Sequence, residues 1–65
     1  MIKTECRFNM GNKFWYIEDT LILHREDGPA IEWYVGAKEW WYHNKQISVD
    51  NQEDFKRYLN LKVFE

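Results

Sequence analysis

The stretch KTECRFNMGNKFWYIE, residues 3–18, decides the fold that this 65-residue chain can adopt. In its first half Cys6, Phe8 and Met10 alternate with polar side chains, and this period of two is typical of a half-buried β-strand. Gly11 follows, and it predicts a tight turn because glycine readily adopts positive φ. A second β-like run comes after the turn, so the stretch predicts an antiparallel hairpin.

The second strand of this hairpin is apolar on both of its faces. Phe14 and Tyr16 point to one side of a strand, whereas Trp15 and Ile17 point to the other. A domain of this size buries only about 60% of the surface of its unfolded chain, so it cannot cover both faces of every aromatic strand. We therefore expect one face of the sheet to keep aromatic rings exposed.

Short β-segments separated by turn residues continue to residue 48. After the first hairpin, strands are expected over residues 21–24, 30–35, 38–43 and 46–48. Structural turn residues are expected at Gly11, Gly28, Pro29 and Gly36, with Gly11-Asn12 and Asn44-Lys45 as turn pairs. Because the connections are short, the pattern predicts a twisted antiparallel β-meander of about five to six short strands.

The hydrophobic period changes to that of a helix in the last quarter of the chain. Phe55, Tyr58 and Leu59 fall on one helical stripe. Asp50 followed by Glu53 is typical of a capping box, in which the first side chain accepts from the start of the helix. The pattern predicts one C-terminal helix that packs on one face of the meander.

A shift of 25 residues aligns the chain with itself, and under this shift Gly11 and Trp15 fall on Gly36 and Trp40. Two degenerate hairpin repeats of this kind are expected to stack and share a core. The fold class is therefore α+β in a single domain, residues 1–65, with the meander over 3–48 and the helix over 50–62. The expected core residues are Phe8, Trp15, Ile17, Ile31, Trp33, Trp40, Phe55, Tyr58 and Leu59.

Composition excludes several classes of function. Nine basic and 11 acidic residues give a net charge of −2, which disfavours a binder of nucleic acid or of anionic membranes. Cys6 is the only cysteine, so an internal disulfide or a cysteine-rich zinc site cannot form. We expect no metal and no cofactor. An unpaired thiol and the lack of an export signal at the start of the sequence predict a cytoplasmic location.

Residues 24–30 read HREDGPA and allow two interpretations. Asp27-Gly28 is a turn dipeptide and Pro29 fixes φ, so the motif can be a purely structural turn that connects the two repeats. Alternatively, His24 acts as a general base oriented by Glu26 or Asp27. That chemistry needs a cleft, which a thin meander seldom offers, so we expect no enzymatic activity.

The segments LHREDGPAIEW, GAKEWWYHNKQI and DNQEDFKRYL resemble the small tryptophan-rich repeat proteins of bacteriophages and large viruses, which are distantly similar to MORN repeats. The resemblance covers residues 11–61 and is most specific at His24 to Ala30. It implies a β-meander of hairpins and a viral origin, and it implies no defined activity. The second turn departs from the family, because Asn44-Lys45 stands where the family prefers Asn-Gly.

Surplus aromatic residues suggest that the protein acts by contact with a partner, because exposed tryptophan and tyrosine are typical of binding hot spots. The hypothesis is a small viral accessory protein that binds and modulates or inhibits a host protein, for example as an anti-defence factor. The alternatives are a self-associating module that forms a homodimer, and a single-stranded nucleic-acid binder that stacks bases on its rings. The candidate partner-binding residues are Phe14, Tyr16, Trp41, Tyr42, Arg25, Glu26 and Asp27.

Overall fold

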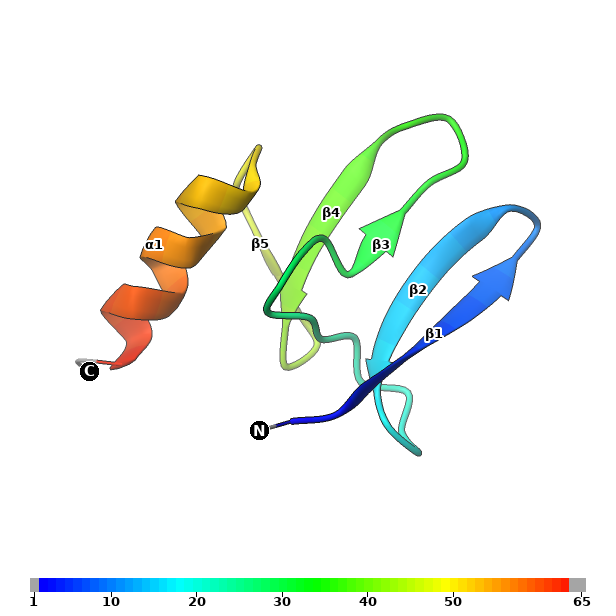
Figure 1. Cartoon of the computed structure of the whole chain (residues 1–65), viewed down its shortest axis with the longest axis horizontal. Helices are drawn as coiled ribbons and strands as arrows, with labels where there is room; N and C mark the ends of the chain where they lie inside the picture. Colours follow the sequence, from blue (N-terminus) through cyan, green and yellow to red (C-terminus); the bar gives the residue numbers. More distant parts are fainter. Residues whose placement is uncertain (1, 64–65) are drawn as a thin grey trace.

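The computed structural model describes residues 2–63 and has one five-stranded antiparallel sheet in the order β1-β2-β3-β4-β5. The strands are β1 (Thr4–Asn9), β2 (Asn12–Ile17), β3 (Ile31–Glu32), β4 (Lys38–Tyr42) and β5 (Lys45–Ile47), and the helix is α1 (Gln52–Val63). Each strand pairs with its neighbour in sequence, so the predicted α+β meander with one helix is confirmed. Figure 1 shows β1 and α1 at opposite sides of the molecule.

The loops of two hairpins lie one residue earlier in the sequence than the predicted turn pairs. Asn9 pairs with Asn12, which makes Met10 and Gly11 the two loop residues, with φ of 53° and 86°. His43 and Asn44 form the second loop, with φ of 48° and 66°. Both positions have positive φ in a two-residue loop of type I′, one of the two loop types that follow the twist of the strands. This requirement overrides the preference of methionine and histidine for negative φ.

The 25-residue repeat is visible in the backbone. Gly11 and Gly36 both have positive φ, at 86° and 100°. Asp19 and Asn44, which also lie 25 residues apart, have φ of 63° and 66°. Two left-handed positions therefore recur at the same places in both hairpin units, whereas Met10 and His43 have no left-handed counterpart 25 residues away.

Residues 21–35 form a shorter β-structure than predicted. Instead of a strand over 21–24, only Leu23 makes a bridge, to Tyr16 of β2. Instead of a strand over 30–35, only Ile31–Glu32 is paired. Both pieces pair with β2, and residues 24–30 form the loop between them.

The helix begins one residue later than the predicted capping box allowed. The side-chain oxygen of Asn51 accepts the backbone N–H of Asp54 at 2.9 Å, so Asn51 and not Asp50 is the N-cap. Glu53 and Asp54 occupy the first turn, where the helix dipole favours negative charge.

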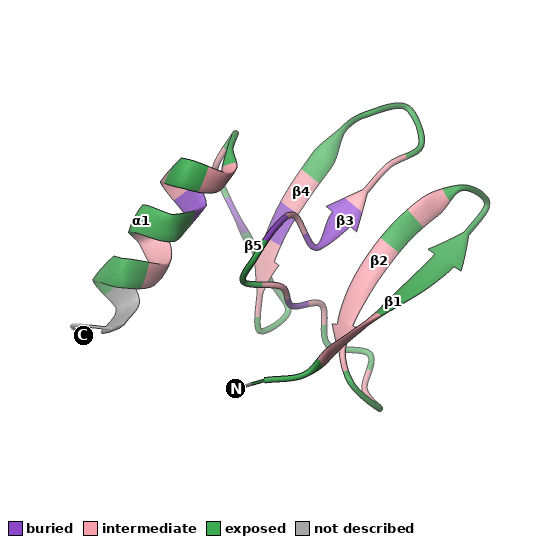
Figure 2. Cartoon of the chain, in the orientation of Figure 1, coloured by how far each residue is buried: buried purple, intermediate pink, exposed green. Residues whose placement is uncertain are grey.

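The main core lies between the helix and the β4–β5 hairpin (Figure 2). Trp40, Ile47 and Phe55 are buried there, and Tyr58 and Leu59 are partly buried against them. Ile31 is also buried, at 4% exposure, whereas Trp15, Ile17 and Trp33 are only half-buried.

The assignment of Phe8 to the core was wrong, because its side chain is 70% exposed. The helix packs on β4 and β5, at the other end of the sheet from β1. Phe8 is approached by Lys13, whose Nζ lies 5.7 Å from the ring centroid, and this contact leaves most of the ring exposed. Cys6 is also exposed. The alternating pattern of β1 therefore does not mark a half-buried strand.

Candidate partner-binding surface

The register divides the aromatic residues between two faces of the sheet. Trp15 and Trp40 lie on the face that α1 covers in part, because Trp40 pairs with Ile47 and both contact Phe55. Phe14 of β2 pairs with Ile31 of β3, and side chains of paired residues share a face. Successive residues alternate, so Phe14 and its neighbours lie on the opposite face.

This opposite face, which we call the aromatic face, consists of Phe14, Tyr16, Trp33 and Trp41. The ring of Phe14 stacks on Tyr16 at 6.4 Å between centroids and meets Trp33 edge-on at 5.6 Å. All four side chains are half-buried, and no helix or strand among residues 2–63 lies over them. The rings therefore shelter one another while keeping part of their surface available.

One carboxylate fixes two of the indoles. Glu39 Oε2 accepts the Trp33 Nε1–H at 2.7 Å, and Glu39 Oε1 accepts the Trp41 Nε1–H at 3.1 Å. Arg7 lies over the ring of Tyr16 with its guanidinium carbon 5.0 Å from the centroid. These contacts hold the rings in fixed orientations, and ordered aromatic side chains lose less entropy when a partner binds.

Three of the predicted partner-binding residues, Phe14, Tyr16 and Trp41, come together on the aromatic face. Tyr42 does not, because it follows Trp41 in β4 and its ring lies 4.8 Å from His24 on the other face. Trp33 was assigned to the core and instead joins the aromatic face. The signal that could have placed it is its separation of two residues from Ile31, which puts both on one side of the chain.

The HREDGPA motif is a loop that both strands beside it help to close. The backbone N–H of His24 donates to the carbonyl of Trp15 at 3.1 Å. The N–H of Trp15 in turn donates to the carbonyl of Ala30 at 2.8 Å. Trp15 of β2 therefore binds both ends of the loop. On the β4 side, the N–H of Arg25 donates to the carbonyl of Trp41 at 3.2 Å.

Arg25 occupies the centre of this loop. Its guanidinium carbon lies 4.0 Å from the centroid of Trp15, and its Nε donates to Asp27 at 2.9 Å. Nη1 donates to the carbonyl of Pro29 and to Glu32. The hydrogen bond from Arg25 holds the pKa of the Asp27 carboxyl below its usual range. The cation therefore ties the loop to the sheet.

His24 is fully buried, and both ring nitrogens are used within the fold. The backbone N–H of His43 donates to Nδ1 at 3.1 Å, so Nδ1 must be an acceptor. Nε2 therefore carries the proton of the neutral ring and donates to Glu26 Oε2 at 3.0 Å. A general base needs a ring nitrogen that can reach a substrate, and here both are occupied.

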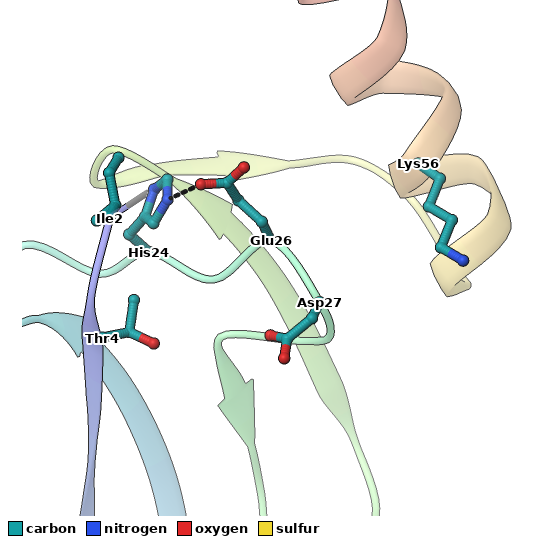
Figure 3. Close-up of a pocket in the computed structure, with 6 residues that line it drawn as sticks. All are labelled: Ile2, Thr4, His24, Glu26, Asp27 and Lys56. Atoms are coloured by element: carbon teal, nitrogen blue, oxygen red, sulfur yellow. Dashed lines mark hydrogen bonds and ion pairs between the residues drawn. The ribbon is translucent and has the colours of Figure 1, made fainter.

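A cavity of about 440 Å³ lies beside this histidine (Figure 3). The residues that line it are Ile2, Thr4, His24, Glu26, Asp27 and Lys56. Figure 3 shows Glu26 between the imidazole of His24 and the helix that carries Lys56. The dashed line in the figure marks the hydrogen bond between His24 and Glu26. Among the described residues, no group of three histidine, cysteine, aspartate or glutamate side chains could hold a metal ion.

Comparison with known proteins found no match to any protein-family model, to any curated protein or to any solved structure. Within residues 2–63, the helix is neither long nor apolar enough to cross a lipid bilayer.

Proposed function

We propose that the protein is a binding module that recognises another protein through its aromatic face. The observation that carries this proposal is a set of four half-buried rings, Phe14, Tyr16, Trp33 and Trp41, on a sheet face that no described element covers. Tryptophan and tyrosine are enriched among the residues that dominate binding energy, because they offer large apolar area with few rotatable bonds.

The charge around the rings supports a protein partner over a nucleic acid. Glu39 lies between the two indoles, and Glu5 lies beside Arg7 at the edge of the same face. Carboxylates at these positions repel phosphates, whereas nucleic-acid binding by stacking uses a basic groove. A viral accessory role, in which this face captures and inhibits a host protein in the cytoplasm, rests on the motif resemblance at His24 to Ala30.

Contact rather than catalysis is further supported by His24. Its two nitrogens are held by a backbone amide and by Glu26, so it contributes to folding of the loop. Single-stranded nucleic acid is a distinct outcome of the test below, because bases can stack on exposed tryptophan rings.

Photo-crosslinking in the cell tests the proposal. Benzoylphenylalanine replaces Trp41 in one chain and Arg57, on the exposed side of α1, in a matched control chain. The account expects a discrete protein adduct from the Trp41 position that the Arg57 position does not give. An adduct with nucleic acid, or the same adducts from both positions, would overturn the assignment of this face to a protein partner.

A further inference from the structure

The outer edge of β1 is an unpaired strand edge. In the described residues 2–63 β1 pairs only with β2, and its last four residues are all exposed. Phe8 and Met10 are 70% and 91% exposed at this edge. Open, exposed edges invite pairing with another strand, and natural proteins usually protect them.

The hydrogen-bond pattern fixes which residues of β1 can pair outward. The N–H of Glu18 donates to the carbonyl of Lys3 at 2.9 Å, which continues the β1–β2 ladder. Residues 3, 5, 7 and 9 therefore direct their backbone groups toward β2. Thr4, Cys6 and Phe8 direct their N–H and carbonyl groups outward.

We propose that β1 pairs antiparallel with β1 of a second copy of this chain, in the register that places Cys6 opposite Cys6. Thr4 then lies opposite Phe8 of the second copy, and all three outward residues exchange hydrogen bonds. The result is a two-fold symmetric dimer with one continuous sheet of ten strands, twice the five of one chain.

Charge selects this register among its neighbours. Glu5 and Arg7 flank Cys6, so in this register each Glu5 lies opposite Arg7 of the second copy. A shift of two residues in one direction would place Glu5 opposite Glu5, and a shift in the other direction would place Arg7 opposite Arg7. Opposite charges directly across two strands stabilise the pair, and like charges destabilise it.

The monomer already holds these charges in position. Arg7 Nη2 donates to Glu5 Oε1 at 2.7 Å within β1, and the same carboxylate oxygen lies 3.3 Å from the N–H of Asp19. The hydrogen bonds from Arg7 and from Asp19 lower the pKa of the Glu5 carboxyl, which is therefore anionic at neutral pH. Pairing would join two such ion pairs into one group of four charges.

The dimer would also cover apolar surface that the monomer exposes. Phe8 of the second copy would lie beside Thr4, at the rim of the cavity that Ile2 and Thr4 line. Paired residues share a face, so the aromatic faces of the two copies would lie on the same side of the joined sheet. Two binding faces on one side raise the avidity for a partner that presents repeated sites.

Charge reversal tests this dimer by sedimentation of purified chains from micromolar to near-millimolar concentration. Because the strand contact is small, weak reversible association of the unchanged chain is expected. Glu5→Arg alone and Arg7→Glu alone each create two like-charge contacts and should weaken dimerisation about tenfold. An equimolar mixture of the two variants restores both opposite-charge contacts, so it should form heterodimers.

Lys45→Glu, at the exposed edge of β5, is the matched control and should leave association unchanged. Far-UV circular dichroism confirms that each variant is folded. A second measurement adds diamide, which takes two electrons and two protons from a pair of thiols, to trap Cys6 to Cys6. The facing Cα atoms would lie about 5.5 Å apart, within the range of a disulfide.

Several results would overturn the proposal. One is an unchanged chain that stays monomeric at the highest concentration. Another is association that Lys45→Glu weakens and Glu5→Arg does not, since this would place the contact at the other edge. A third is a mixture of the two charge variants that stays monomeric. These results concern association through the β1 edge of the chain alone, whereas the binding function proposed above is tested by crosslinking from Trp41 in the chain with its β1 unchanged.

Discussion

At the scale of single residues, Gly28 and Arg25 depend on each other. A Cβ atom at Gly28 would lie 2.8 Å from the guanidinium carbon of Arg25, closer than carbon atoms can approach. Arg25 cannot move away without losing its contacts with the ring of Trp15 and with Asp27. Glycine is needed here because of close packing, since Gly28 is not among the glycines with positive φ.

A double-mutant cycle measures this dependence. Gly28→Ala should lower the free energy of unfolding by about 1–2 kcal/mol, because the cation–π contact and hydrogen bonds of Arg25 are disturbed. In the Arg25→Ala background the same change should cost much less, because the clash is gone. Urea denaturation of the four chains gives the coupling. Equal costs in both backgrounds would show that the two residues are independent.

The HREDGPA motif also shows what could be predicted at this scale. Asp27-Gly28 and Pro29 indicated a turn from their backbone preferences alone, and the chain bends at residues 26–28. The role of Arg25 could not be predicted, because its partners Trp15 and Glu32 lie on other segments of the chain. Side-chain partners of this kind depend on tertiary contacts that local sequence does not contain.

At the scale of elements, two adjacent residues, Asp50 and Asn51, are candidates for the N-cap of α1, and substitution of each one tells them apart. Asn51→Ala should destabilise the protein by about 1 kcal/mol, because the N–H of Asp54 loses its acceptor. Asp50→Ala, at the predicted capping position, should have little effect. Thermal unfolding followed at 222 nm (a wavelength sensitive to helix) compares the two variants. A larger loss for Asp50→Ala would contradict the assignment of the N-cap.

The strands show why pattern predicts some elements better than others. The β1–β2 hairpin was predicted because the turn residue Gly11 and the alternating apolar side chains beside it indicate the same hairpin within one continuous stretch. The strand expected over 30–35 shrank to Ile31–Glu32, because the turn at Gly36 begins at Trp33, whose carbonyl accepts the N–H of Gly36 at 2.9 Å. Residues 33–35 therefore belong to the turn, although strand propensity alone had assigned them to the sheet.

At the scale of the whole molecule, one helix cannot cover a five-stranded sheet. The Cα atoms span 38 × 26 × 15 Å, and α1 packs on Trp40 and Ile47 near one end. The sequence indicated correctly that aromatic side chains would remain outside the core. It could not show which ones. Alternation does not reveal which face the helix will cover, and Trp33 was misassigned for this reason. Alternation also does not reveal how far the helix reaches across that face, and Phe8 was misassigned because the helix does not extend to β1.

The open aromatic face is the central claim, and ¹⁹F NMR of the protein labelled with 5-fluorotryptophan tests it most directly. A soluble gadolinium chelate relaxes the signals of exposed rings and spares those of buried rings. Single Trp→Phe variants assign the four signals. The account predicts strong relaxation for Trp33 and Trp41 and almost none for Trp40, which is 5% exposed. Protection of Trp33 and Trp41 equal to that of Trp40 would contradict it.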